Sequence, residues 1–240
     1  MKEFPELADI TSAAAALAGI AHETPLEASA TFSAMVGQPV YLKLENLQKT
    51  GSFKLRGAFN KIRLLSATEK AHGVIAASAG NHAQGVAYAA RQAGIRAVIV
   101  MPETAPLSKV SATRGYGAEV VLAGASYDEA YGRAKELSAA EGLTFVHAFD
   151  DPAVMAGQGT IGLEILRELP EVRAVIVPVG GGGLIAGVAK AVKSLAPQVK
   201  VIGVQAEGAD AMVRSKAADR LIQTPTAVTI ADGIAVKAPG

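Results

Sequence analysis

The chain has 240 residues and is 50% hydrophobic, which provides enough apolar material for one large soluble domain or two small ones. Lysine and arginine total 23 against 22 aspartates and glutamates, so a net charge of +1 gives no general field for nucleic acid or a membrane surface. Cysteine is absent, which excludes disulfides, thiolate metal sites and a cysteine nucleophile and suits a reducing cytoplasm.

The first informative elements lie between residues 39 and 65. The segment PVYLKLE is typical of an edge strand, and a helix is expected after ENLQKTGSF. Lys54 falls in the first turn of that helix, at the border of its apolar face. Helical spacing places these residues on that face: Leu55, Ala58, Phe59, Ile62 and Leu65.

From Gly73 onward, short β-branched runs alternate with longer amphipathic segments. The runs are GVIAAS, RAVIVM, AEVVLA, LTFVH, RAVIVPV and KVIGVQ. This alternation predicts parallel strands covered by helices. One helix has clear ends, because Ser126 and Glu129 match a capping box and Gly142 a helix stop. Pro106 and Pro152 indicate the first turns of two more helices.

No membrane-spanning helix is expected. The longest uncharged stretch, residues 174–189, contains a proline and five glycines. It is also shorter than the roughly 18 to 20 residues that a spanning helix needs.

Lys54 is the first candidate for chemistry. Most lysines at a helix end are surface residues whose ammonium reaches water. Here the positive end of the helix dipole disfavours an ammonium, and the neighbours Phe53 and Leu55 limit its hydration. Both effects lower the pKa of the amine. A neutral amine is what Schiff-base formation with a carbonyl requires.

The second candidate is PVGGGGLIAG, residues 178–187, which follows a strand-like run and precedes a helical pattern. Successive glycines let backbone N–H groups converge, and the helix N-terminus adds its dipole, so the segment predicts a phosphate cradle. A flexible tight turn is the plainer alternative.

A dinucleotide fingerprint is a further alternative for this segment. Gly181, Gly183 and Ala186 satisfy G-x-G-x-x-A, but the next strand ends in Gln205, where an acidic residue would bind a ribose. A second match begins at Gly157 but follows no strand, so we attribute it to chance.

The third candidate is SAGNHAQG, residues 78–85, between a strand and a helix. Ser78 is a plausible N-cap, and Asn81 and His82 stand at the helix start, where free N–H groups could hold a carboxylate or a ring oxygen. Capping or simple packing would explain the same residues. The histidines show no metal-ligand spacing, so no metal site is expected.

Together these stretches resemble a known family. ENLQKTGSFKLRGAFNKI, ASAGNHAQGVA, MPETAPLSKV, GQGTIGLEI, VPVGGGGLIAG and IADGIAV are similar to segments of the fold-type II pyridoxal-phosphate enzymes, and most closely of the short, catabolic threonine dehydratases. The resemblance covers essentially the whole chain in the family's order. It implies an α/β fold of two lobes, each an open parallel sheet covered by helices. Residues 1–72 and 150–240 would form the large lobe, and residues 73–149 the small one.

The resemblance also implies roles for individual residues. Lys54 would hold pyridoxal 5'-phosphate as a Schiff base, with Phe53 packed beside the cofactor. Asn81 would bind the 3-hydroxyl group of the ring. The cofactor phosphate would be bound by the glycine loop: Gly180, Gly181, Gly182, Gly183 and Leu184. The substrate carboxylate would be bound by the helix start: Ser78, Ala79, Asn81 and His82.

The implied reaction is dehydration and deamination of L-threonine to 2-oxobutanoate and ammonia, with L-serine giving pyruvate. The family role lies in amino-acid metabolism, including isoleucine biosynthesis. A small amino acid would be the substrate, with no nucleic-acid or membrane partner, and a cytoplasmic homo-oligomer is expected.

Departures from the family pattern sharpen this interpretation. Serine racemases carry a second serine where this chain has Ala79, and a methyl group cannot shuttle a proton, so racemisation should be weak. Gln205 and Ala211 occupy positions that supply metal-binding acids in the racemase branch, so no Mg or Ca is expected there. The family's catalytic domain continues past IADGIAVKAPG, so its last part, including a serine that faces the pyridine nitrogen, is expected to be missing.

Three alternatives remain open from the sequence. The chain could be a non-catalytic module that binds the cofactor or assists assembly. A racemase-like isomerase is the second alternative. A nucleotide-binding oxidoreductase that uses the glycine loop is the third, but it leaves Lys54 and SAGNH unexplained.

Overall fold

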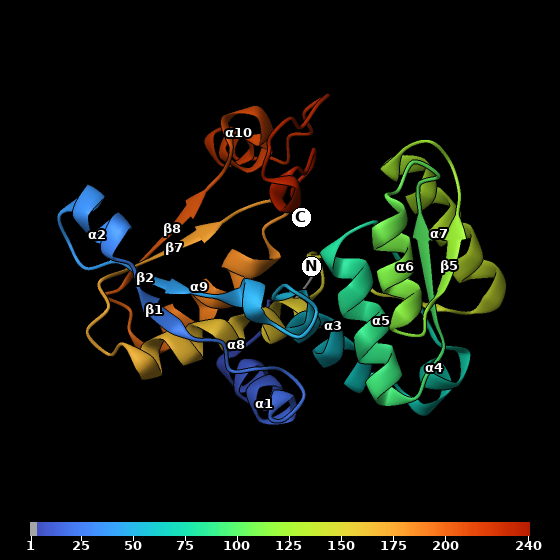
Figure 1. The fold of residues 1–240 in the computed structure, drawn as a ribbon, viewed down its shortest axis with the longest axis horizontal. Coiled ribbons are helices and arrows are strands. Elements are labelled where there is room, and N and C mark those ends of the chain that lie inside the picture. The colour runs from blue at the N-terminus through green and yellow to red at the C-terminus, as the bar shows by residue number, and fades with distance from the viewer. Residues whose placement is uncertain (1–3) are drawn as a thin grey trace.

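The computed structural model describes residues 4–240, which form three separate sheets with helices packed around them (Figure 1). The largest sheet is parallel, with strand order β5-β4-β3-β6. Its strands are β3 (Val74–Ala77), β4 (Ala97–Met101), β5 (Glu119–Leu122) and β6 (Thr144–Phe145). The helices between and beside them are α4 (Ala67–His72), α5 (Asn81–Ala93), α6 (Leu107–Gly115) and α7 (Tyr127–Glu141).

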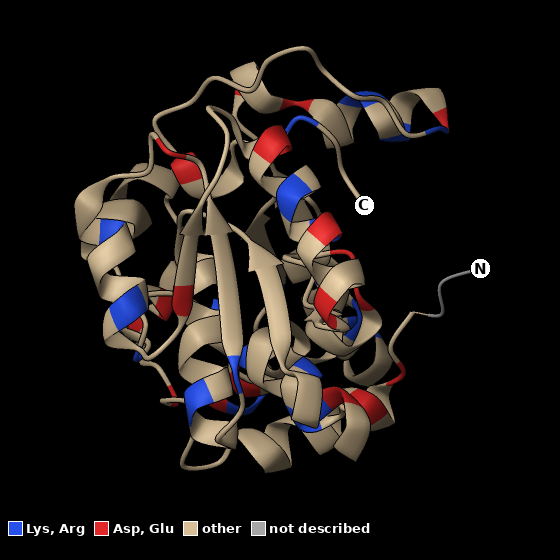
Figure 2. Ribbon diagram, turned by 90° about the vertical axis from the view of Figure 1, so that its right-hand side faces the viewer, with Lys and Arg blue, Asp and Glu red and all other residues tan. Residues whose placement is uncertain are grey.

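The two central strands, β3 and β4, are buried on both faces, which explains their near-continuous apolar sequences. Along β3, Val74 and Ala76 contact one buried cluster, whereas Ile75 and Ala77 contact another that includes α7. Figure 2 shows helices on either side of these strands, with basic and acidic residues interspersed along them. The strands predicted within residues 73–147 are therefore confirmed.

Helix signals predicted in this part of the chain are confirmed as well. Ser126 caps α7 by accepting a hydrogen bond from the Glu129 N–H, and Gly142 ends the helix with φ of 67°. One detail differs, because the Glu129 carboxylate accepts from the Ala125 N–H rather than from the cap residue.

The second sheet pairs β7 (Ala174–Pro178) with β8 (Lys200–Val204) in parallel, as predicted. One face packs against α8 (Pro152–Glu168) and α9 (Gly183–Leu195), where Val175 and Val177 are buried. On the other face the side chain of Ile176 is 68% exposed and that of Ile202 44% exposed. Within residues 4–240, helices thus cover only one face of this sheet.

The N-terminal elements form a small antiparallel pair beside this sheet. The pair consists of β1 (Leu26–Ala28) and β2 (Tyr41–Lys43), so the predicted strand in PVYLKLE is confirmed. Around it lie α1 (Leu7–Leu17), α2 (Ala30–Val36) and the 3-10 turn η1 (Glu45–Leu47). Beyond β8 the chain forms η2 (Glu207–Ala209), α10 (Ala211–Ala218) and η3 (Asp232–Ile234).

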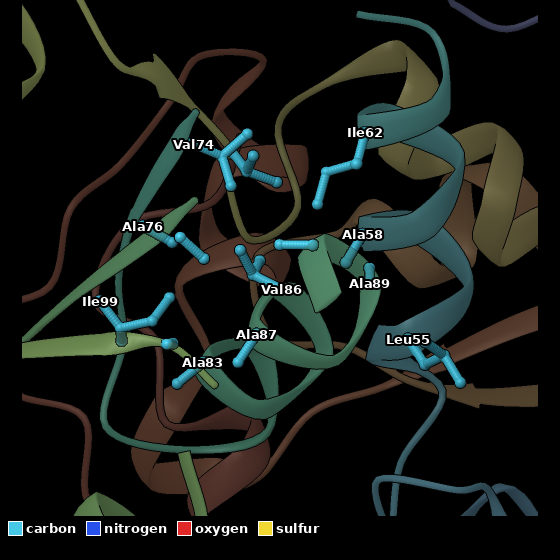
Figure 3. Close-up of a cluster of buried hydrophobic side chains, with 14 of the residues drawn as sticks. Leu55, Ala58, Ile62, Val74, Ala76, Ala83, Val86, Ala87, Ala89 and Ile99 are labelled. Carbon is cyan, nitrogen blue, oxygen red and sulfur yellow. The ribbon is translucent and has the colours of Figure 1, made fainter. Parts of the chain in front are cut away.

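Helix α3 (Lys54–Arg63) lies between these two groups of elements (Figure 1). Its Leu55, Ala58 and Ile62 are fully buried against α5 and the β3–β4 strands (Figure 3). This is the apolar face that the sequence predicts. The division into lobes at residues 72 and 150 stays a prediction, since α3 packs against both groups.

Helix α8 is the element that fixes α3 relative to α9. A side chain on Gly157 would overlap the backbone of Arg56 and Gly57 in α3. Two residues on, a Cβ on Gly159 would stand 2.9 Å from the Gly187 carbonyl oxygen of α9. The match that begins at Gly157 is therefore a set of helix-packing glycines, consistent with dismissing it as a nucleotide motif. No helix within residues 4–240 is both long and apolar enough to cross a membrane.

Candidate active site

Lys54 is the first residue of α3. Its Nζ donates a hydrogen bond to the Ala148 carbonyl oxygen at 2.7 Å and lies 5.3 Å from the centroid of the Phe53 ring. The residue is half-buried, and burial lowers the pKa of its amine from 10.5 to about 8. At pH 7 roughly a tenth of the Lys54 amine is therefore neutral and nucleophilic, against well under about one part in a thousand at the usual pKa.

The glycine loop shares a cavity with Lys54. The cavity has a volume of about 60 Å³, and its lining residues are Phe53, Lys54, Phe149, Pro178, Gly180, Gly181, Gly182, Gly183, Leu184, Gly233, Ile234 and Val236. The loop ends in the first turn of α9, whose N–H groups have no partner inside the helix. Those donors and the helix dipole favour an anion beside the amine.

Different positions of this loop require glycine for different physical reasons. Gly182 has φ of 102°, a backbone conformation that residues with side chains rarely adopt. A side chain on Gly181 would overlap the ring of Phe149, and a Cβ on Gly183 would lie 2.8 Å from the Phe149 Cα. The loop is thus kept free of side chains partly to let Phe149 pack against it.

The start of α5 is close to Lys54 through the backbone. A Cβ on Gly85 would stand 3.0 Å from the Lys54 carbonyl carbon. Asn81 begins α5 as predicted and is exposed. The prediction that Ser78 is the N-cap is wrong: Gly80 occupies that position, and Ser78 Oγ accepts from the Gly80 N–H at 3.2 Å.

His82 is buried, and its Nε2 donates to the Val146 carbonyl oxygen at 2.9 Å. Its Nδ1 has no hydrogen-bond partner within residues 4–240. Burial, followed by the nearby charge of Lys54, lowers the pKa of this imidazole to about 3. His82 is therefore neutral at physiological pH. We expect four residues of the segment 78–82 to bind the substrate carboxylate, but none of them lines the cavity. Their roles stay predictions.

A buried ion-pair network holds the first turn of α3, two residues beyond Lys54. The Arg56 guanidinium, 1% exposed, donates to Glu45 at 2.7 and 2.9 Å and to both oxygens of Glu164. Burial alone would lower the pKa of Arg56, but the hydrogen bonds to Glu45 and Glu164 raise it above its usual value. Lys43 joins the network through Glu164 at 2.8 Å.

No group of three or more potential metal-ligating side chains lies together within residues 4–240. The side chain of Gln205 instead bonds the backbone, donating to the Val179 oxygen at 3.2 Å and accepting from the Val213 N–H at 2.9 Å.

Sequence reasoning found Lys54, Phe53 and the glycine loop but missed several residues of the site. Ala148 and Phe149 lie on the turn between β6 and α8, and no local pattern distinguishes them. The segment IADGIAV resembles the family but carries no local signal of a site. Gly233, Ile234 and Val236 in it nevertheless line the cavity.

These residues fit pyridoxal phosphate. The aldehyde needs a neutral amine, which burial favours at Lys54, and the phosphate needs backbone donors, which the glycine loop and the start of α9 bring to the same cavity. Fold and site together define an enzyme of the pyridoxal-phosphate-dependent class.

Comparison with known proteins agrees. Residues 17–240 match the family model described as pyridoxal-phosphate dependent enzyme, and the chain belongs to this family. It is 56% identical over 234 residues to the L-threonine ammonia-lyase of Thermotoga maritima, covering 98% of this chain and 58% of that protein. This chain thus spans little more than half the length of that curated relative.

Two solved structures are also similar to the chain. The processed form of threonine deaminase isoform 2 from Solanum lycopersicum has a TM-score of 0.93 and 45% identity, covering all of this chain and 68% of that one. Maize serine racemase has a TM-score of 0.95 and 39% identity, covering 99% and 72%. The expected family and the fold-type II class, an α/β arrangement with parallel sheets and helices, are confirmed, whereas the division into two lobes stays a prediction.

Proposed function

We propose that this chain carries the amine and phosphate-binding part of a threonine ammonia-lyase, which converts L-threonine to 2-oxobutanoate and ammonia. The observation that carries the proposal is the Lys54 amine, buried beside the glycine loop with its pKa lowered to about 8. The similarity to proteins named threonine ammonia-lyase and threonine deaminase supports this choice of reaction.

Lys54 would have two roles in this reaction. It would hold the cofactor covalently, and its amine, displaced by the substrate amino group, would take the proton from the substrate Cα. When bound, pyridoxal phosphate supplies an electron sink for the charge left on that carbon. The Ala148 carbonyl, which accepts from Nζ at 2.7 Å, would orient the amine between these roles.

The remaining residues would bind the cofactor and the substrate. The N–H groups of Gly180 to Leu184 would hold the phosphate, and Phe53 would pack beside the cofactor ring. Asn81 would bind the 3-hydroxyl group, and the start of α5 would hold the substrate carboxylate. His82 is a poor candidate for proton transfer, because its Nε2 is bonded to Val146 and its pKa is lowered to about 3.

The balance of atoms follows from one elimination and one hydrolysis. Loss of the Cα proton and the β-hydroxyl group removes water from threonine. Hydrolysis of the resulting imine consumes water and releases 2-oxobutanoate and ammonia. L-Serine, which lacks the methyl group, would give pyruvate. Ala79 offers no proton donor for the opposite face of Cα, which disfavours racemisation.

The first experiment is an absorbance spectrum of the purified chain with added pyridoxal phosphate, before and after L-threonine, together with a 2-oxobutanoate assay. We expect a visible absorbance band that responds to threonine, together with formation of 2-oxobutanoate. Lys54→Ala should abolish the band, whereas Lys216→Ala, which removes an exposed lysine on α10, should leave it.

Other outcomes distinguish the alternatives. A band without product would support a non-catalytic cofactor-binding module. Formation of D-serine from L-serine would support an isomerase, which the likeness to maize serine racemase makes the second candidate. Binding of a dinucleotide that survives Lys54→Ala would support an oxidoreductase.

Assembly and location are also part of the proposal. We expect a homo-oligomer, supported by exposed apolar side chains such as Ile176 and Ile202, and sedimentation velocity would test it. A cytoplasmic location is supported by the absence of cysteine.

A further inference from the structure

Phe149 stands in the cavity shared by Lys54 and the glycine loop, and the reaction outlined above gives it no role. Its ring lies where a side chain on Gly181 would be, and its backbone is close to Gly183. The cavity left beside the ring is about 60 Å³. Sites for small molecules typically measure roughly 300–1,000 Å³, so the cavity beside the ring is too small for a cofactor while the ring stays in this position.

The turn that carries Phe149 is held by His147. The His147 Nδ1 accepts hydrogen bonds from the N–H groups of Phe149 at 3.3 Å and of Asp150 at 2.9 Å. Its ring also meets the Phe149 ring edge to face, with centroids 4.7 Å apart and planes at 87°. The hydrogen bonds hold the backbone of the turn, and the ring contact places the Phe149 ring against the loop.

The same turn also holds the amine. Ala148, next to Phe149, accepts the hydrogen bond from Lys54 Nζ at 2.7 Å. One short segment therefore places both a polar anchor at the amine and an apolar cover over the glycine loop.

We propose that Phe149 is a positioning residue for Lys54: its ring closes the cavity over the glycine loop, keeps water from the amine, and turns aside when the cofactor phosphate binds. The inference rests on the cofactor-binding part of the proposed function and is independent of the substrate. It assigns the turn between β6 and α8 a direct effect on the reactivity of the amine.

Removing the ring then has two effects of opposite sign. Water reaches Nζ, so the pKa of Lys54 rises from about 8 toward 10.5. Uptake of the cofactor no longer waits for the ring to move, so the reaction becomes faster wherever the amine is already neutral. The other ionisable groups that neighbouring elements bring to this region are His82 on α5, His147 and Asp150 on the turn, and exposed Asp232 in η3.

The test is the rate at which cofactor-free protein reacts with pyridoxal phosphate, followed by absorbance in stopped flow from pH 6 to 11. In the wild type we expect half of the limiting rate near pH 8. In Phe149→Ala this midpoint should rise by about one pH unit or more, while the limiting rate at high pH should increase about threefold or more.

Two further variants make the test specific. Phe149→Leu keeps an apolar cover but less of it, so its midpoint should rise by less; it also carries the test if the alanine variant does not fold. Phe145→Ala is the matched control, because Phe145 packs against Tyr131 and does not line the cavity. It should keep the wild-type midpoint.

An unchanged midpoint in both Phe149 variants would overturn the inference, as would an equal rise in Phe145→Ala, which would indicate general loosening. A lower limiting rate in Phe149→Ala would refute the claim that the ring must move. If the wild type reacts with the cofactor but makes no 2-oxobutanoate, the dehydratase proposal fails while the inference stands. If the wild type does not react at all, both fail.

Discussion

Replacing Lys54 with methionine should stabilise the cofactor-free protein at pH 7. Methionine has a similar length but no charge, so the variant avoids placing an ammonium in an apolar cavity. Lowering a pKa from 10.5 to about 8 means that the protonated amine costs the folded state on the order of 3 kcal/mol at most, at about 1.36 kcal/mol per pKa unit. Loss of the hydrogen bond to Ala148 offsets about 1 kcal/mol of this gain.

The net gain in unfolding free energy is therefore about 2 kcal/mol at pH 7, which corresponds to a rise in Tm of roughly 4–8 °C for a chain of this size. The size of this stability gain depends on pH. Below pH 8 both states of the wild type carry the proton, so the cost is complete. Between pH 8 and 10.5 the unfolded wild type binds more protons, so the wild type gains stability as pH rises and the difference disappears.

Urea unfolding followed by circular dichroism, at pH 7 and again near pH 10, measures both parts of this prediction. Cofactor must be absent, because its binding stabilises only the wild type. A Lys54→Met protein that is no more stable than the wild type at pH 7 would show that the amine is not held in a desolvated site. A gain that stays the same at both pH values would show that it has another cause.

Two further predictions concern the support of the site. Arg56→Met should lower the unfolding free energy by about 3–5 kcal/mol, because Glu45 and Glu164 would lose the buried cation that they share. Adding Glu45→Gln and Glu164→Gln should restore much of this stability, as measured by urea unfolding. Gly187→Ala should cost about 1–3 kcal/mol or more, because its Cβ would overlap the Met155 carbonyl oxygen, whereas Gly132→Ala, in open space on α7, should be neutral or stabilising by up to about 1 kcal/mol in the same assay.

The strands and the main helices could be predicted from the sequence because their signals are local. The run RAVIVPV is β-branched and becomes β7, and the ends of α7 are marked by Ser126 and Gly142. Lys54 was found in the same way, since its position in the helix and its neighbours are enough to suggest a desolvated amine.

Other parts of the site depend on contacts between distant segments, which local patterns do not encode. Arg56 pairs with Glu164, 108 residues away, so its burial could not be foreseen from its neighbours. Phe149 packs on Gly181 from a separate turn. Ser78 is a different case: it bonds Gly80 only two residues further on, so one local hydrogen bond replaced another local one, the predicted cap. The carboxylate-binding role of the α5 start rests on resemblance alone, and residues 78–82 do not line the cavity.

The close crossings of α8 with α3 and α9 have a consequence for redesign. Because the helices approach closely at Gly57, Gly157 and Gly187, the separation between the start of α3, which carries Lys54, and the start of α9, which carries the glycine loop, is set by backbone contacts. Side chains elsewhere in the core could then be substituted without changing that separation. Helices α3, α8 and α9 form a rigid scaffold that holds Lys54 and the glycine loop. Substrate preference could be altered at residues around the cavity while this scaffold is left unchanged.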